Sequence, residues 1–294
     1  MNHEERVARL LRARTFLFVP GDRPDRIAKA MQSSADAVII DLEDAVRPES
    51  KATARELLVS PVQQFRSDSG PLVLIRTNDW KSPEFSIDIA LAFDIQVDAI
   101  MVPKFVPGAD AIAIDETLTK VETSAEREEK LSLIGLIEST AGVLNLLSSQ
   151  VIPDRFKRLA FGAADLYADL GVTYSSSGPN TDLAMAVLVV ASAHQNLGAP
   201  IDSPHFTVDD LVGLKERASF AHAMGFGAKL CIHPNQLATV AEIFTVSAQE
   251  KDWATRVIQR WQKRDESAGA LLIDGALVDE AMVKQARRIL GTLN

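Results

Sequence analysis

The feature that most constrains the fold is a repeated alternation of short apolar runs with helical patterns. Each run is rich in Val, Ile, Leu and Phe without clean polar alternation, which is typical of strands buried on both faces. Eight such runs occur, at residues 15–19, 37–41, 72–76, 99–103, 133–138, 158–162, 199–201 and 228–232. Strand alternating with helix indicates parallel βαβ units, and eight units in order predict a closed barrel.

We therefore expect an α/β protein, a (β/α)8 TIM barrel with a C-terminal helical extension. The alternative is an open doubly wound sheet, but the glycine fingerprint that such a sheet carries after its first strand is missing. We assign residues 1–245 to the barrel and residues 246–294 to the extension, and we expect the extension to contact a neighbouring subunit. Helices are predicted there over residues 252–266 and 279–290, on either side of the segment AGALLIDGALVD.

Composition excludes several classes of function. The net charge is −9 and basic residues form no local patch, so a nucleic-acid partner is not expected. Cys231 is the only cysteine, which rules out an intrachain disulfide or a cysteine-based zinc site. No apolar stretch approaches the roughly 20 residues of a membrane span, and the charged first residues lack the apolar core of a signal peptide. A cytoplasmic location without a membrane partner is the expectation.

Polar residues gather where the apolar runs end. In α/β barrels the carboxyl ends of the strands meet at one face, and chemistry is carried there. Glu138 and Asp165 end adjacent runs, so their carboxylates can share one ion. Mg²⁺ takes one or two protein carboxylates and leaves its other positions to water and substrate. The competing interpretation, that each acid caps a helix or pairs with a base, is equally open from spacing alone.

The basic residues at the same ends also allow two interpretations. Arg76 ends an apolar strand, and its guanidinium can grip a substrate carboxylate or form a structural ion pair with the acids at 41–44. Lys104 is either a ligand contact or a neutraliser of nearby acids. The sequence has no GxSxG turn, which disfavours nucleophilic serine catalysis, and Cys231 in AKLCI is best read as a buried structural thiol.

An ordered set of motifs resembles the citrate lyase β-subunit-like group of the HpcH/HpaI aldolase superfamily. The set extends over most of the chain, from about residue 14 to residue 279, and consists of RTFLFVPGDRPDRIAKA, ADAVIIDLEDAV, IRTND, MVPKF, GLIESTAGV, FGAADLYADLG, APID, KLCIHPNQ and IDGALVD. The resemblance implies a TIM barrel that forms a homotrimer or homohexamer and uses Mg²⁺, with Mn²⁺ as a substitute. It also implies cleavage of a carbon–carbon bond in citryl, malyl or citramalyl thioesters.

Residue roles follow from the resemblance position by position. It places the metal on Glu138 and Asp165, and in coenzyme A-dependent members the acid of the C-terminal segment, here Asp279, reaches a neighbouring subunit's site. A helix N-cap is the alternative role for Asp279. The remaining candidates implied by the resemblance are Arg76, Asp41 and Glu43 as catalytic residues, and Arg76, Lys104, Arg14 and Glu138 as substrate-binding residues.

Three departures from the family pattern bear on the substrate more than on the chemistry. The segment before Asp165 reads Gly-Ala-Ala where an acid is usual, position 186 lacks the usual Arg, and Ala228 replaces a Gly. We expect an Mg²⁺-dependent lyase that cleaves a β-hydroxyacyl thioester such as citramalyl-CoA or malyl-CoA to an acyl-CoA and a 2-keto acid. The alternatives are a citrate lyase β-subunit acting on citryl-acyl-carrier protein, a malyl-CoA-type thioesterase, and a non-catalytic barrel that binds an organic acid.

Overall fold

The computed structural model describes residues 1–127, 129–148, 151–173, 178–264 and 269–291. Within it the chain divides into two compact units, Met1–Phe244 and Thr245–Asn294. Each unit is described by itself.

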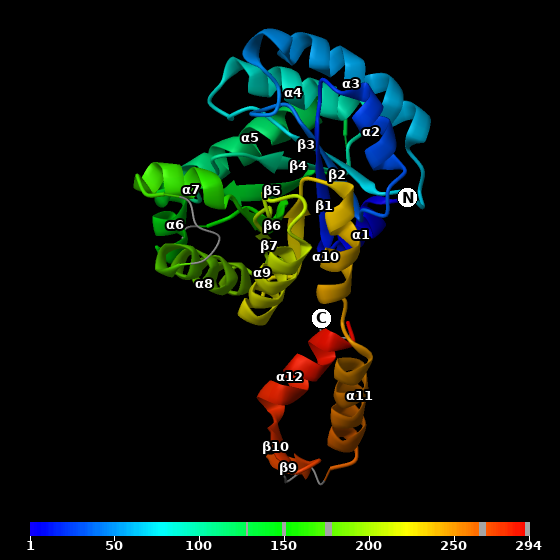
Figure 1. Ribbon diagram of the computed structural model, residues 1–294, viewed down its shortest axis with the longest axis vertical. Helices are drawn as coiled ribbons and strands as arrows, with labels where there is room; N and C mark the ends of the chain where they lie inside the picture. Colours follow the sequence, from blue (N-terminus) through cyan, green and yellow to red (C-terminus); the bar gives the residue numbers. More distant parts are fainter. Residues whose placement is uncertain (128, 149–150, 174–177, 265–268, 292–294) are drawn as a thin grey trace. The chain divides into compact units, whose positions relative to one another are not determined.

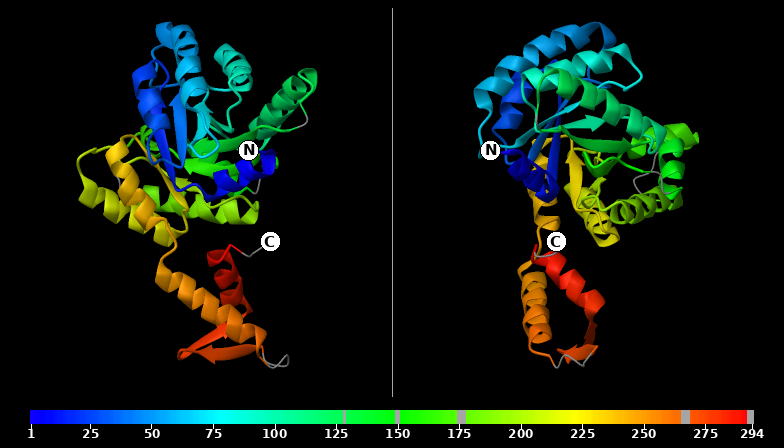
Figure 2. Two further views of the ribbon diagram at one scale, coloured as in Figure 1. Left: turned by 90° about the vertical axis from the view of Figure 1, so that its right-hand side faces the viewer. Right: turned by 180° about the vertical axis from the view of Figure 1, so that it is seen from behind.

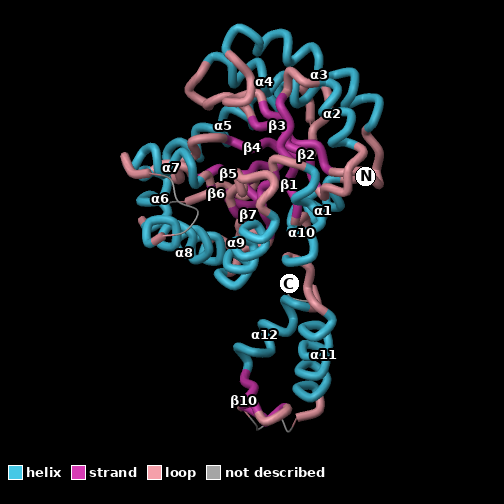
Figure 3. Tube along the Cα trace, in the orientation of Figure 1, coloured by secondary structure: helices cyan, strands magenta, loops and turns pink. Residues whose placement is uncertain are grey.

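The first unit is built on a closed barrel of eight parallel strands that follow one another in chain order (Figure 3). The closed barrel predicted from the alternating runs is confirmed. The seventh strand is the shortest, and only Ala160 with Ile201 connects it in register to the sixth. The strands are β1 (Thr15–Pro20), β2 (Ala37–Asp41), β3 (Leu72–Arg76), β4 (Ala99–Val102), β5 (Ser132–Ile137), β6 (Phe156–Phe161), β7 (Ile201–Asp202) and β8 (Ala228–Cys231).

Helices surround the barrel strands in the first unit (Figures 1 and 2). The first of them, α1, precedes the barrel and contributes Leu10 to the apolar cluster inside it. The described α-helices of this unit are α1 (His3–Arg12), α2 (Pro24–Met31), α3 (Lys51–Phe65), α4 (Pro83–Asp94), α5 (Ala109–Ser124), α6 (Thr140–Leu147), α7 (Ala163–Leu170), α8 (Pro179–His194), α9 (Leu211–Met224) and α10 (Leu237–Ile243).

Buried side chains form two layers, because successive residues of a strand point to opposite faces. Ile39 and Leu74 belong to the cluster that fills the barrel, whereas Val38 and Val73 belong to the cluster that packs against the helices. This burial on both faces explains why the strands read as continuous apolar runs. The barrel interior is therefore filled, and the space for a ligand lies beyond the strand ends.

The second unit is small and has its own apolar cluster. It contains α11 (Ala248–Gln262), the antiparallel pair β9 (Ala270–Ile273) and β10 (Ala276–Asp279), and α12 (Glu280–Ile289). Asp274 and Gly275 connect the two strands, both with positive φ, as a tight hairpin turn requires. Trp261, Ile273 and Val278 are buried in the cluster. Leu272 and Leu277 form a cross-strand pair that is 68% and 66% exposed.

No helix in the described part of the chain is both long and apolar enough to cross a membrane.

Candidate active site

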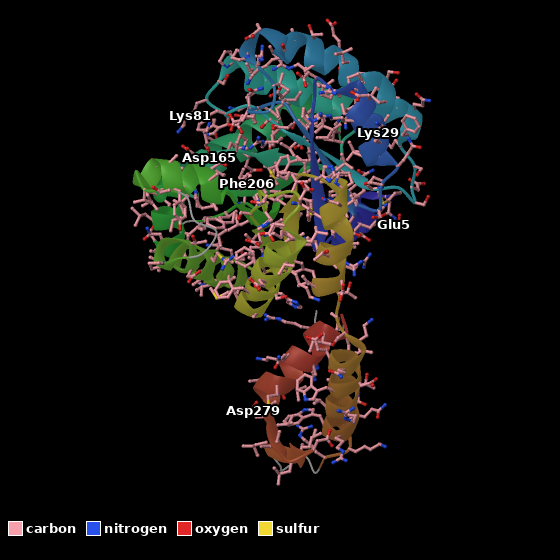
Figure 4. The ribbon with its side chains drawn as sticks, in the orientation of Figure 1. Glu5, Lys29, Lys81, Asp165, Phe206 and Asp279 are labelled. Carbon is pink, nitrogen blue, oxygen red and sulfur yellow. The ribbon has the colours of Figure 1, made fainter. Side chains whose placement is uncertain are left out.

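A cavity of about 370 Å³ opens at the carboxyl ends of the barrel strands. Apolar side chains make up much of its wall, including Phe18, Leu136 and Phe206. Figure 4 labels Phe206 and Asp165, which both line this space. The charged residues on its lining are Arg26, Asp41, Asp44, Arg76, Glu138 and Asp165. A mostly apolar cavity with a few convergent charges is the usual form of a small-molecule site.

Arg76 is fixed by two acids on the neighbouring strand and its loop. Its Cα is in register with that of Asp41, and its Nε and Nη2 donate to the two Asp41 oxygens at 2.8 and 2.6 Å. Glu43 Oε2 lies 3.2 Å from Nη1. Burial lowers the pKa of Arg76, but hydrogen bonds and charge from Asp41 outweigh that effect and raise it. Arg76 therefore stays charged, and both roles considered for it are compatible with this geometry.

Glu43 is a buried acid that ion pairs neutralise. Its side chain lies between Arg76 and Lys104, whose Nζ is 2.9 Å from Oε1. Neither oxygen accepts a hydrogen bond of good geometry from the described residues, so the contact is mainly one of charge. Burial raises the pKa of Glu43, and the charges of Arg76 and Lys104 oppose the increase. Arg76, Glu43 and Lys104 thus form a continuous charge network beside the cavity.

Glu138 is 4% exposed and follows β5. Its Oε1 accepts a hydrogen bond from the backbone amide of Lys104 at 2.7 Å. Burial, together with the charges of Glu43 and Asp165, raises the pKa of Glu138 to about 8. A buried carboxylate whose charge is opposed by nearby acids is the kind of group that a cation stabilises.

The donor set fits Mg²⁺. Glu138 and Asp165 would supply hard oxygen ligands from the ends of adjacent barrel strands, and Asp165 lies in the first turn of α7. The described residues contain no group of three or more His, Cys, Asp or Glu side chains able to hold a metal. Two carboxylates with open positions suit Mg²⁺, which keeps several sites for water and substrate, better than a metal that needs an all-protein cage.

Gly162, which follows β6, allows the backbone there to approach Glu138 at the end of β5 closely. A Cβ at this position would lie 2.5 Å from Glu138 Cβ and 2.7 Å from its Oε2. The Gly162 amide also donates to the carbonyl of Ile137 at 2.9 Å. Any side chain at position 162 would therefore displace Glu138.

A second cavity of about 340 Å³ adjoins the first, because both are lined by Phe18, Pro20 and Ile232. It carries the basic residues Arg26 and Lys29 from α2, which are exposed. His233 also lines it, and the His233 side chain accepts from the Asn235 amide at 3.3 Å. An elongated ligand with a polar, anionic distal part fits the two cavities together.

Two predicted site residues lie elsewhere. Arg14 precedes β1, so the whole strand separates it from the cavity, and its amide donates to Asp36 at 2.8 Å. The structure does not bring Arg14 to the site. Asp279 belongs to the second unit, where its Oδ1 caps α12 by accepting from the amides of Ala281 and Met282 at 3.0 and 3.1 Å. The helix-cap role considered for Asp279 is therefore present.

Sequence reasoning missed Phe18, Arg26 and Phe206, which all line the cavity. Phe18 stacks under the Arg76 guanidinium with its ring centre 5.1 Å away. A signal existed for Arg26, since a basic residue in the first turns after a barrel strand lies near the mouth. Phe206 had none, because its loop follows β7, the shortest strand.

Fold and site together define a TIM-barrel protein with a small-molecule site at the carboxyl ends of its strands. Residues 14–234 match the HpcH/HpaI aldolase/citrate lyase family, and the chain belongs to that family. It is 30% identical to an L-malyl-CoA/β-methylmalyl-CoA lyase of Rhodobacter capsulatus, over 94% of this chain and 93% of that protein. It is 31% identical to a citrate lyase subunit beta-like protein of Deinococcus radiodurans, over 94% of this chain and 96% of that one.

Among solved structures, the chain is similar to protein CitE from Mycobacterium tuberculosis, crystallised with magnesium, acetoacetate and coenzyme A. The TM-score is 0.74 at 26% identity, and the likeness covers 96% of this chain and 98% of that one. The family expected from the ordered motifs is confirmed.

Proposed function

We propose that this protein is an Mg²⁺-dependent carbon–carbon lyase that cleaves a β-hydroxyacyl-CoA of the malyl or citramalyl type to an acyl-CoA and a 2-keto acid. The observation that carries the proposal is the placement of Glu138 and Asp165 beside Arg76 around one cavity. Supporting it, curated relatives are named as a malyl-CoA lyase and a citrate lyase β-like protein, and the CitE structure holds magnesium and coenzyme A.

Glu138 and Asp165 would hold the ion. When bound, Mg²⁺ supplies Lewis acidity toward the substrate oxygen that becomes the keto-acid carbonyl. The chain prepares this site by orienting Glu138 through the Lys104 amide and by excluding water with the apolar wall.

Arg76 would bind the carboxylate of the keto-acid half. An arginine has five N–H donors, and among the described residues Asp41 and Glu43 face three of them. The remaining donors can reach a substrate carboxylate, while Asp41 keeps the guanidinium from rotating. Lys104, half exposed and beside Glu43, would add a second positive charge at the same end.

Cleavage requires two proton movements. Loss of the 3-hydroxyl proton lets the bond between the α-carbon and the carbinol carbon break, which yields the keto acid and a thioester enolate. The enolate carbon then takes a proton. We assign that donor to Asp279 of a neighbouring copy, so that the protein acts as a homotrimer or homohexamer. Asp279 lies in register with Ala270 on the hairpin that exposes Leu272 and Leu277, an apolar surface suited to a second copy.

The second cavity would receive the thioester carrier. Arg26 and Lys29 can neutralise phosphates, and the shared wall at Phe18 and Pro20 would guide an extended arm toward the metal ligands. Two basic residues suit the several phosphates of free coenzyme A better than the single phosphate of a carrier-protein arm.

The test is a coupled assay of the full chain with Mg²⁺ against malyl-CoA, citramalyl-CoA and citryl-CoA, in which keto acid and free thiol are detected separately. Keto acid without free thiol is expected for malyl-CoA or citramalyl-CoA, and Glu138→Gln should abolish it. Free thiol without keto acid would indicate a thioesterase instead. If the protein binds Mg²⁺ but turns over none of the three, a citryl-acyl-carrier protein becomes the substrate to test.

A further inference from the structure

One acid near the site has no role in the reaction proposed above. Asp169 lies in α7, and its Oδ2 accepts two hydrogen bonds from Thr140. The Thr140 amide donates at 2.7 Å and the Thr140 hydroxyl at 2.6 Å. Thr140 is the first residue of α6 and Asp169 is the last but one of α7, so the contact joins the beginning of the helix after β5 to the end of the helix after β6.

The contact satisfies a group that the helix itself leaves unpaired. The first amides of an α-helix have no intrahelical acceptor. In α6 the Ser139 side chain accepts from the Gly142 amide at 3.1 Å, and Asp169 accepts from Thr140. A negative charge at this end also interacts favourably with the helix dipole. Asp169 therefore caps a helix other than its own.

The two residues of this cap lie close in sequence to the two proposed metal ligands. Thr140 comes two residues after Glu138, and Asp169 comes four residues after Asp165. Residues four apart lie on the same face of a helix, so the face of α7 that carries Asp165 also carries Asp169. Together with the close contact between Gly162 and Glu138, the cap ties the two ligand-bearing segments to each other at both ends.

From this we infer that Asp169 is a positioning residue that sets the separation of the Glu138 and Asp165 carboxylates by clamping α7 to Thr140. The inference rests on the proposed function, because it assumes that these two carboxylates bind Mg²⁺. It assigns no contact between Asp169 and the metal or the substrate. The clamp acts through the main chain, so its loss should weaken Mg²⁺ affinity in addition to removing the stability that any helix cap contributes.

The experiment measures Mg²⁺ binding to the full chain by calorimetry, without substrate, in Asp169→Ala, Thr140→Val and Thr140→Ser variants. Ala removes the acceptor oxygen, which Asn would keep. Loss of a group that orients a metal ligand typically weakens affinity by about tenfold or more. We expect that loss in Asp169→Ala and a smaller one in Thr140→Val, which keeps the amide donor. Thr140→Ser keeps both donors and should bind Mg²⁺ as the unsubstituted protein does.

Glu250→Ala is a matched control. Glu250 Oε2 accepts from both the amide and the hydroxyl of Ser247 at 2.7 Å, the same pair of donors, at the start of α11 in the second unit. The unfolding temperature without metal should fall to a similar extent in Glu250→Ala and Asp169→Ala, whereas Mg²⁺ affinity should fall only in the latter.

Unchanged Mg²⁺ affinity in Asp169→Ala would overturn the inference and leave the proposed function standing. So would a full loss in Asp169→Ala with no effect of Thr140→Val, since Asp169 would then be a ligand itself. Failure of the unsubstituted protein to bind Mg²⁺ would overturn both. The double variant Asp169→Ala/Thr140→Val should be no worse than Asp169→Ala, because both changes remove one clamp.

Discussion

The Glu138 carboxylate is held by the main chain of Lys104, whose amide donates to Oε1 at 2.7 Å. Lys104 adopts φ 50°, in the left-handed region that side chains with a Cβ disfavour. The strained backbone directs this amide toward Glu138. Lys104 therefore has two separable roles, one through its side-chain charge and one through its backbone conformation.

Replacing Lys104 with Gly should therefore destabilise the fold less than replacing it with Ala. The left-handed conformation costs an Ala roughly 1–2 kcal/mol, which exceeds the roughly 0.4–1 kcal/mol that Gly loses through its freer unfolded state. Both variants lose the charge beside Glu43 and should lose activity alike. Urea unfolding measures the difference, and equal stability of the two variants would show that the conformation is unstrained.

The binding of Mg²⁺ should depend on pH through Glu138. Its pKa of about 8 means that below this value a proton must leave before the ion binds. The apparent affinity should rise by up to about tenfold per pH unit as the pH approaches 8, and then level off. Calorimetry in buffers of different ionisation enthalpy counts the released proton. Glu138 carries a proton over most of the range from roughly pH 6 to 8, which lies below its pKa. Affinity independent of pH in that range would contradict the assignment of Glu138 as a metal ligand.

The raised pKa of Glu138 also makes the folding stability of the metal-free protein depend on pH. The pKa of Glu138 rises from the unfolded value of 4.5 to about 8 on folding. Folding is thus favoured by protonation of this group: the contribution is fully present below pH 4.5 and is lost as the pH rises through about 8. The metal-free protein should be less stable above that pH, and added Mg²⁺ should reverse the loss.

Asp279 can be tested apart from its role as a helix cap. Asn caps a helix about as well as Asp, whereas Ala costs about 1 kcal/mol. Asp279→Asn should keep the stability of the second unit but lose turnover by about 10²–10⁴-fold, the usual contribution of a general acid. Asp279→Ala should lose both. Near-normal turnover in Asp279→Asn, measured as keto acid released, would mean that Asp279 is not the proton donor. Its role would then be limited to capping α12 through the amides of Ala281 and Met282.

The pair Arg76–Asp41 should be strongly coupled. Removing one partner of a buried ion pair leaves an uncompensated charge and costs about 3–5 kcal/mol. Arg76→Ala and Asp41→Ala should each show losses of that order in denaturant unfolding, and the double variant should lose less than their sum. The pair Lys81–Asp110, with Lys81 60% exposed, is the control, for which about 0–1 kcal/mol is expected.

The barrel was predictable because its signal is local and repeated. Runs such as 37–41 and 72–76 match β2 and β3 residue for residue, since a strand buried on both faces must be apolar throughout. The hairpin of β9 and β10 was missed although Asp274-Gly275 is a strong turn signal, because the short strands on either side lack clean alternation. The helix α7 is not predicted, because its eight residues lie within the strand-end motif FGAADLYADLG.

The candidate site was predictable only in part. Strand ends converge in any barrel, so the convergence of Asp41, Arg76 and Glu138 follows from topology. Contacts that depend on backbone detail do not follow. The left-handed φ of Lys104 and the cap from Asp169 to Thr140 arise from loop geometry, which spacing in the sequence does not encode.

The division of the chain into Met1–Phe244 and Thr245–Asn294 has a genetic consequence. Glu138 lies in the first unit and Asp279 in the second, and under the proposed function one complete site draws them from different copies. Two alleles, one encoding Glu138→Gln and the other Asp279→Asn, would then each be null alone and complement one another when co-expressed, since mixed assemblies regain intact sites. Alleles with defects in Glu138 and Arg76, both in the first unit, would not.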